Sequence, residues 1–104
     1  MQANPEVAKF AHWVADQGLK RSVASGGHRA IVHKTLDIVG LKDLFPIIVT
    51  QDDVTKSKPD PEIFLLAAQK MNVAPERCLV LEDSLLGIQG AMAGGMSAVL
   101  VRFD

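Results

Sequence analysis

The sequence predicts an α/β domain with a doubly wound parallel sheet. Four stretches with helical apolar spacing alternate with four short apolar runs of strand length, and this alternation is typical of parallel sheets that helices cover on both faces. The run Ile47-Ile48-Val49-Thr50 lacks in-out alternation, which indicates a strand that is buried on both faces. With 104 residues, the chain has the length of one small domain.

Composition excludes several classes of protein. Hydrophobic residues make up 48% of the chain, charged residues make up 22%, and the net charge is -1, so no excess of positive charge attracts nucleic acid. No apolar run reaches the roughly 18 residues of a membrane span, and the first residues lack the apolar core of a signal peptide. Cys78 is the only cysteine, which excludes an intrachain disulfide and favours a reducing compartment, so we expect a cytoplasmic protein. Cys78 itself is expected to be a buried strand residue.

The first half of the chain is expected to begin with a helix. A helix from residue 5 to 17 would bury the apolar face Val7, Phe10, Ala11 and Val14 and would end at a left-handed Gly18, with Trp13 packing at the edge of that face. The expected elements that follow are a strand over 20–24, a turn at 25–27, a helix over 28–39 that ends at Gly40, and a strand over 47–50.

The second half repeats this order after a polar loop over 51–58. Asp60 is expected to cap the next helix, with Pro61 as its first residue. The core-facing residues of that helix are Phe64, Ala67, Ala68 and Met71. A turn at 75–77, a strand over 78–81, a helix over 84–93 that ends at Gly94-Gly95, and a strand over 97–101 complete the prediction.

Residues with useful chemistry follow three of these strands. Ser25 follows the first strand, the 51–58 loop follows the second, and Glu82-Asp83 follow the third. Ligands of doubly wound sheets bind beyond the carboxyl ends of the strands. We therefore expect these three segments to converge in space.

Each segment has two interpretations when it is taken alone. Glu82 and Asp83 suit Mg²⁺, which prefers carboxylate oxygen, but Asp83 or Ser84 could instead cap the following helix. The Ser25-Gly26-Gly27 turn could bind phosphate through open amides, or it could simply connect a strand to a helix. Lys58 could neutralise that phosphate or could lie in solvent. Taken together, a hydroxyl, a lysine and two carboxylates favour phosphate and Mg²⁺ chemistry.

Four further polar residues are expected to lie on the surface. His28 is near the expected anion site and could orient a substrate, whereas His33 lies one turn further along the helix. Asp52 and Asp53 could reach a ligand from the loop, but a solvated acidic loop explains them equally well.

Three motifs resemble those of the haloacid dehalogenase superfamily, in its β-phosphoglucomutase and phosphoglycolate phosphatase-like branch. The second, third and fourth motifs of that family are similar to SVASGG, KSKPDPEIFLLAAQKMNV and CLVLEDSLLGIQGAMAGGMSAVLV, and their central parts lie near residues 21–27, 56–61 and 78–84. The resemblance covers nearly the whole chain, which we interpret as a single partial core domain over residues 1–104.

The resemblance implies a role for each matching residue. Ser25 and the backbone of Gly26 would bind a phosphoryl group, and Lys58 would stabilise its charge and the nucleophile. Asp83 would bind Mg²⁺ directly, with Glu82 at or near the metal shell. The implied activity is that of a Mg²⁺-dependent phosphatase or phosphomutase acting on a small phosphorylated metabolite.

The first motif of the family, an apolar strand followed by Asp-x-Asp-Gly-Thr, does not occur in this sequence. That motif carries the nucleophilic aspartate, so we expect the chain alone to be inactive or nearly so. The cap domain, which selects substrate in the family, is also expected to be missing. The absent strand is the central one in this family's sheet. We expect either that the 20–24 and 78–81 strands pair directly, or that a second copy or another polypeptide supplies a strand.

Two other functions stay open at this point. One is a non-catalytic module that binds phosphate, metal or a partner chain. The other is a receiver domain of the response-regulator kind, which is also doubly wound, but no acid pair follows an early strand as such a domain requires.

Overall fold

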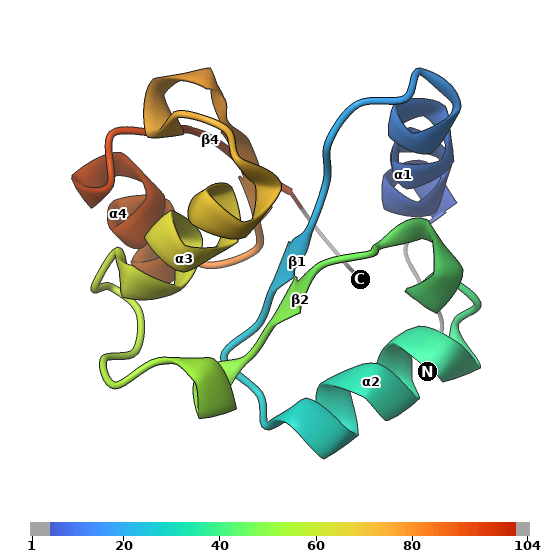
Figure 1. Cartoon of the computed structure of the whole chain (residues 1–104), viewed down its shortest axis with the longest axis horizontal. Helices are drawn as coiled ribbons and strands as arrows, with labels where there is room; N and C mark the ends of the chain where they lie inside the picture. The colour runs from blue at the N-terminus through green and yellow to red at the C-terminus, as the bar shows by residue number, and fades with distance from the viewer. Residues whose placement is uncertain (1–4, 102–104) are drawn as a thin grey trace.

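The computed structural model describes residues 5–101 and contains all four predicted helices and all four predicted strands in the predicted order (Figure 1). The elements are α1 (Pro5–Asp16), β1 (Val23–Ala24), α2 (Arg29–Ile38), β2 (Ile48–Val49), α3 (Glu62–Met71), β3 (Leu79–Glu82), α4 (Leu85–Ala93) and β4 (Ser97–Leu100). Single 3-10 turns are η1 (Lys42–Leu44), η2 (Gln51–Asp53) and η3 (Pro75–Arg77). No helix within the described residues is long and apolar enough to cross a membrane.

The strands form two parallel pairs, each of them part of a β–α–β unit. β1 pairs with β2, with Val23 opposite Ile48, and β3 pairs with β4, with Leu79 opposite Ser97. The parallel α/β class is therefore confirmed. In Figure 1, α2 and α3 lie on opposite sides of the β1–β2 pair, as expected for a doubly wound arrangement.

The expectation that the 20–24 and 78–81 strands pair directly is wrong. Within residues 5–101, β1 and β3 belong to separate two-stranded sheets. The side chain of Lys58, and not a ladder of backbone hydrogen bonds between the strands, joins the carboxyl ends of β1 and β3. Lys58 Nζ lies 2.7 Å from Glu82 Oε2 at the end of β3 and 3.4 Å from the Ala24 carbonyl oxygen at the end of β1.

The core lies around α3. Its predicted inward residues Phe64, Ala67 and Ala68 are buried, whereas Met71 is only half-buried. α3 packs against both strands of the first sheet and against α4, so one apolar helix face covers parts of both units. The buried apolar cluster consists of Val49, Ile63, Phe64, Ala67, Ala68, Ala91 and Met96.

The apolar face of α1 is less covered than its spacing predicts. No residue of α1 is buried, and Phe10 is 39% exposed. Trp13 is 52% exposed and stacks on Phe10 with 5.9 Å between ring centroids. The reason is tertiary: the main packing partner of α1 is the short η1 turn. The predicted end of the helix at a left-handed Gly18 is confirmed, with φ at +70°.

The start of α4 has a side-chain cap, whereas the N-cap of α3 is Pro61, which makes none. Ser84 Oγ accepts a hydrogen bond from the Gly87 N–H at 3.1 Å, so Ser84 and not Asp83 caps α4. Asp60 Oδ1 accepts from the Glu62 N–H at 2.9 Å. The α3 helix begins at Glu62, one residue later than predicted.

Two adjacent ion pairs hold the start of α2 against η2. His28 Nδ1 lies 2.9 Å from Asp52 Oδ1, and Arg29 Nη2 lies 2.8 Å from Asp53 Oδ1. The Thr50 N–H donates to the other Asp53 oxygen at 2.9 Å. The Thr50 backbone hydrogen bond and then Arg29 lower the pKa of Asp53, and the His28 hydrogen bond lowers the pKa of Asp52.

These lowered pKa values predict a loss of stability in acid. A carboxyl group whose pKa is lower in the folded than in the unfolded chain stabilises the fold above its unfolded pKa of about 4, and this contribution disappears as the pH falls through the folded pKa. In urea unfolding between about pH 5 and pH 2, Asp53→Asn should therefore flatten the dependence of stability on pH. Asp43→Asn, at an exposed acid of η1, is the matched variant that removes one negative charge elsewhere. Parallel curves for Asp53→Asn and the parent would contradict this account.

Candidate functional site

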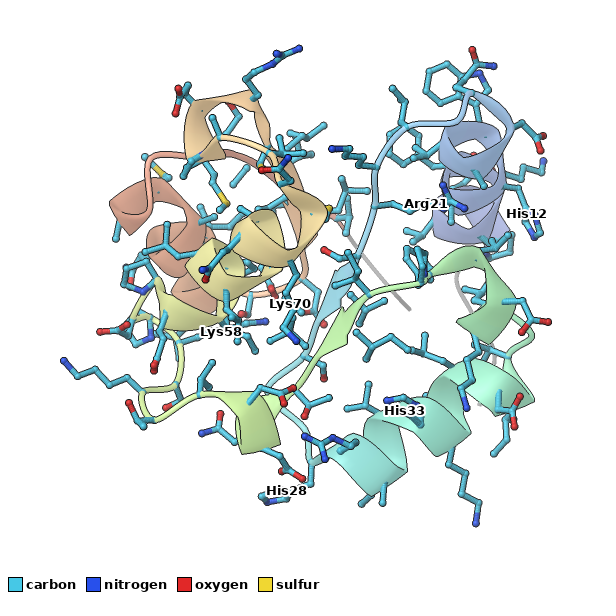
Figure 2. All side chains as sticks on the ribbon, in the orientation of Figure 1. His12, Arg21, His28, His33, Lys58 and Lys70 are labelled. Carbon is cyan, nitrogen blue, oxygen red and sulfur yellow. The ribbon has the colours of Figure 1, made fainter. Side chains whose placement is uncertain are left out.

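Lys58 lies where the three segments expected to carry chemistry meet (Figure 2). Its ammonium contacts the carbonyl oxygen of Ala24, the residue before Ser25, and the carboxylate of Glu82, the residue before Asp83. The predicted convergence of these segments is therefore observed. One cation connects the carboxyl end of β1, the loop before α3 and the carboxyl end of β3.

The Glu82 carboxylate is buried and fully hydrogen-bonded. Its side chain is 9% exposed, and that of Lys58 is 18% exposed. Glu82 Oε2 accepts a hydrogen bond from the Lys58 ammonium. The other oxygen, Oε1, accepts from the Asp83 N–H at 3.2 Å and from the Ser84 hydroxyl at 3.4 Å. A buried charge is tolerated only with such partners. Lys58 also lies over the Phe64 ring, 5.1 Å from its centroid.

The Asp83 carboxylate differs from that of Glu82 in its surroundings. Asp83 is exposed, and within residues 5–101 its side chain has no hydrogen bond or ion pair. An uncommitted carboxylate beside a committed one fits Mg²⁺, which takes one or two protein carboxylates and keeps several waters. The described part of the chain has no group of three or more His, Cys, Asp or Glu side chains that could hold a metal. Any Mg²⁺ held by these residues would therefore keep water ligands.

The Ser25-Gly26-Gly27 turn leaves one backbone N–H, that of Gly26, without a partner among residues 5–101. The Ser25 N–H is fixed to the Val49 carbonyl at 2.9 Å, and Ser25 Oγ accepts from the Gly27 N–H at 3.1 Å. A Cβ atom on Gly26 would meet nothing within 4 Å. His28, at the N-cap of α2, makes no side-chain cap. The Arg29 N–H, in the first turn of α2, donates to the Asp52 carboxylate, so this helix start is already partly satisfied by an acid of the chain.

Several other sequence candidates lie outside this convergence. His28, Asp52 and Asp53 are committed to the α2–η2 ion pairs, and Figure 2 shows His28 and His33 along α2, away from Lys58. Cys78 is half-buried and packs against the core. Burial, and then Glu76, raise the pKa of its thiol, which disfavours a reactive thiolate.

Sequence reasoning missed two contributors to this geometry. The Ala24 carbonyl is a backbone acceptor. Every residue has such a group, so the residue type at position 24 could not indicate this contact. Gly87 lies directly against the Glu82 side chain. The only sequence signal for Gly87 is its place three residues after the Ser84 cap, where helices do not ordinarily need glycine.

Comparisons with known proteins identify the family of the chain. The haloacid dehalogenase-like hydrolase family matches residues 2–95. The chain is 46% identical over 81 residues to the fructose-1-phosphate phosphatase YqaB of Escherichia coli. The aligned residues cover 78% of this chain and 43% of that protein. It is 31% identical over 99 residues to a phosphorylated carbohydrates phosphatase of Thermotoga maritima. This alignment covers 95% of this chain and 46% of that protein.

A solved structure shows the same fold. The β-phosphoglucomutase of Clostridium difficile superposes with a TM-score of 0.86 at 31% identity, over 94% of this chain and 43% of that chain. The chain thus spans about half the length of the relatives that it matches. Sequence, fold and the meeting of its three motifs agree: this chain belongs to the haloacid dehalogenase-like hydrolase family.

Proposed function

We propose that this chain supplies the phosphate-binding and Mg²⁺-binding part of a phosphatase or phosphomutase that acts on a small phosphorylated metabolite. The observation that carries the proposal is the position of Lys58, whose ammonium contacts both Ala24, beside the Ser25 turn, and Glu82, beside Asp83. The names of the two phosphatase relatives, one for fructose 1-phosphate and one for phosphorylated carbohydrates, support a sugar-like substrate.

In this proposal, the phosphoryl group lies against the turn at the end of β1. The Ser25 hydroxyl and the Gly26 backbone donate hydrogen bonds to it, and the positive end of the α2 dipole favours its charge. Lys58 provides the opposing charge from the other side. Because Lys58 is mostly buried, its charge is less screened than that of a surface lysine.

The two carboxylates are given different roles. Asp83 is the direct Mg²⁺ ligand because its carboxylate is exposed and uncommitted. Glu82 is placed at or near the metal shell, since both of its oxygens already accept hydrogen bonds from the chain. When bound, Mg²⁺ would neutralise charge on phosphoryl oxygens.

Binding and charge neutralisation alone do not make a covalent phosphotransferase. The sequence has no Asp-x-Asp-Gly-Thr motif, and in covalent phosphoryl transfer a carboxylate must attack in line with the leaving group. We therefore propose that the chain requires a partner to turn over substrate. The alternative is a non-catalytic module that binds phosphate, metal or another chain.

Free strand edges indicate where a partner would bind. Val23 and Ser25 bond to β2, and Cys78 and Glu82 bond to β4. In parallel ladders alternate residues face one neighbour, so the backbone groups of Ala24, Leu79 and Leu81 point to the other edge of each pair. Because each sheet has only two strands in the described part of the chain, these edges suit a strand from another polypeptide. We propose this occupant over a second copy of the chain, which has no spare strand among residues 5–101.

A cytoplasmic location suits the free Cys78.

Mg²⁺ titrations of two variants test the roles of the carboxylates. Asp83→Asn should weaken Mg²⁺ binding more than Glu82→Gln does, because only the Asp83 carboxylate is uncommitted. Isothermal calorimetry, with circular dichroism as a check on folding, measures both variants against the parent. Equal titration curves for the two variants would remove the assignment.

Activity assays test the need for a partner. The purified chain with Mg²⁺ should not hydrolyse p-nitrophenyl phosphate above the blank, because it has no nucleophile. Adding the part of the YqaB relative that this chain does not match should produce turnover and a heavier species in sedimentation. Robust turnover by the chain alone, or a compact monomer that does not bind the added segment in sedimentation, would contradict this part of the proposal.

A further inference from the structure

Glu82 reaches Lys58 by lying across the backbone of the first turn of α4. A Cβ atom placed on Gly87 would overlap Cγ and Cδ of Glu82 and would lie 2.5 Å from Oε1. Close-packed atoms cannot share this space. The absence of a side chain at Gly87 is therefore a condition for the observed position of the Glu82 carboxylate.

Gly87 is connected to the same carboxylate by a second route. Its N–H donates to Ser84 Oγ at 3.1 Å, and the Ser84 hydroxyl donates to Glu82 Oε1 at 3.4 Å. The first turn of α4 thus holds Glu82 both by leaving space for its methylene groups and by orienting a hydroxyl toward its carboxylate.

We propose that Gly87 is a positioning residue for Lys58 and acts through Glu82. If Glu82 were displaced, the Lys58 ammonium would keep only the Ala24 carbonyl at 3.4 Å and the face of the Phe64 ring, and it would turn toward water. The catalytic meaning of this positioning rests on the proposed phosphate role of Lys58. The positioning itself depends only on the contacts among Gly87, Glu82 and Lys58.

Another glycine of the same segment provides a matched control. A Cβ atom on Gly94, at the end of α4, would meet Pro61 Cβ at 3.3 Å and Leu65 Cδ2 at 3.4 Å, and neither atom belongs to the Lys58–Glu82 pair. Gly94→Ala therefore adds the same methyl group without touching that pair. Helix propensity alone predicts that alanine stabilises a helix relative to glycine, so a loss of stability in Gly87→Ala would have the opposite sign.

The test combines a double-mutant cycle with a chemical probe of Lys58. The variants are Gly87→Ala, Glu82→Ala, the double variant and Gly94→Ala. The first readout is Tm. The second is the rate at which an acylating reagent modifies Lys58, which mass spectrometry measures with the exposed Lys70 as internal reference. Gly87→Ala should lower Tm and speed Lys58 acylation several-fold. With Glu82→Ala already present, the added Gly87→Ala should lower Tm no further and should not speed acylation. Gly94→Ala should keep the parent Lys58 rate.

The proposal is overturned by an unchanged Lys58 rate in Gly87→Ala, or by the same loss of Tm whether or not Glu82 is present. If Gly87→Ala fails to fold, the double variant decides. A folded double variant supports the proposal, whereas an unfolded one beside a folded Glu82→Ala contradicts it. No metal, phosphate or turnover enters these readouts, so their result is distinguishable from a failure of the proposed function.

Discussion

The ion pair between Lys58 and Glu82 is the polar interaction that joins the carboxyl ends of the two β–α–β units, whose apolar parts pack together around α3. Both side chains are largely removed from water, and such burial costs free energy that only close geometry and further hydrogen bonds offset. Here the compensation is complete for Glu82: its two oxygens accept from Lys58, the Asp83 N–H and the Ser84 hydroxyl. Removing one partner of a buried pair of this kind typically costs about 3–5 kcal/mol, because the other charge is left alone.

The same ion pair arranges charge for chemistry. It holds a cation beside the Ser25 turn, where the Gly26 N–H has no partner among residues 5–101. It also satisfies Glu82 and so leaves Asp83 as the uncommitted acid of the pair. Two adjacent carboxylates of the same chemical type thus differ in availability through their surroundings alone, and this difference favours one of them as a metal ligand.

Local features of the fold could be predicted from the sequence, and long-range features could not. The left-handed Gly18 depends on a few neighbouring residues, so residue pattern is sufficient to predict it, whereas for the α4 cap the sequence leaves Asp83 and Ser84 open and the structure selects Ser84. The exposure of Phe10 could not be predicted, because it depends on what covers α1. The failure of β1 and β3 to pair is likewise a long-range feature, because the two strands lie in different halves of the chain.

The candidate site shows the same division. Ser25, Lys58 and Asp83 were predicted as a set because the carboxyl ends of parallel strands meet at one edge, and the structure brings their segments together. The internal commitment of Glu82 and the close approach of Gly87 were not predictable, since both depend on side-chain paths and not on spacing along the chain. The roles of these residues in binding stay predictions.

The most direct test of the central claim, that three distant segments form one site for phosphate and Mg²⁺, is an NMR titration of the 104-residue chain with inorganic phosphate and Mg²⁺. The account predicts that the backbone amide shifts concentrate at Ser25 to Gly27, Lys58, and Glu82 to Asp83. Amide shifts confined to the α2–η2 ion pairs, or none at saturating ligand, would contradict it.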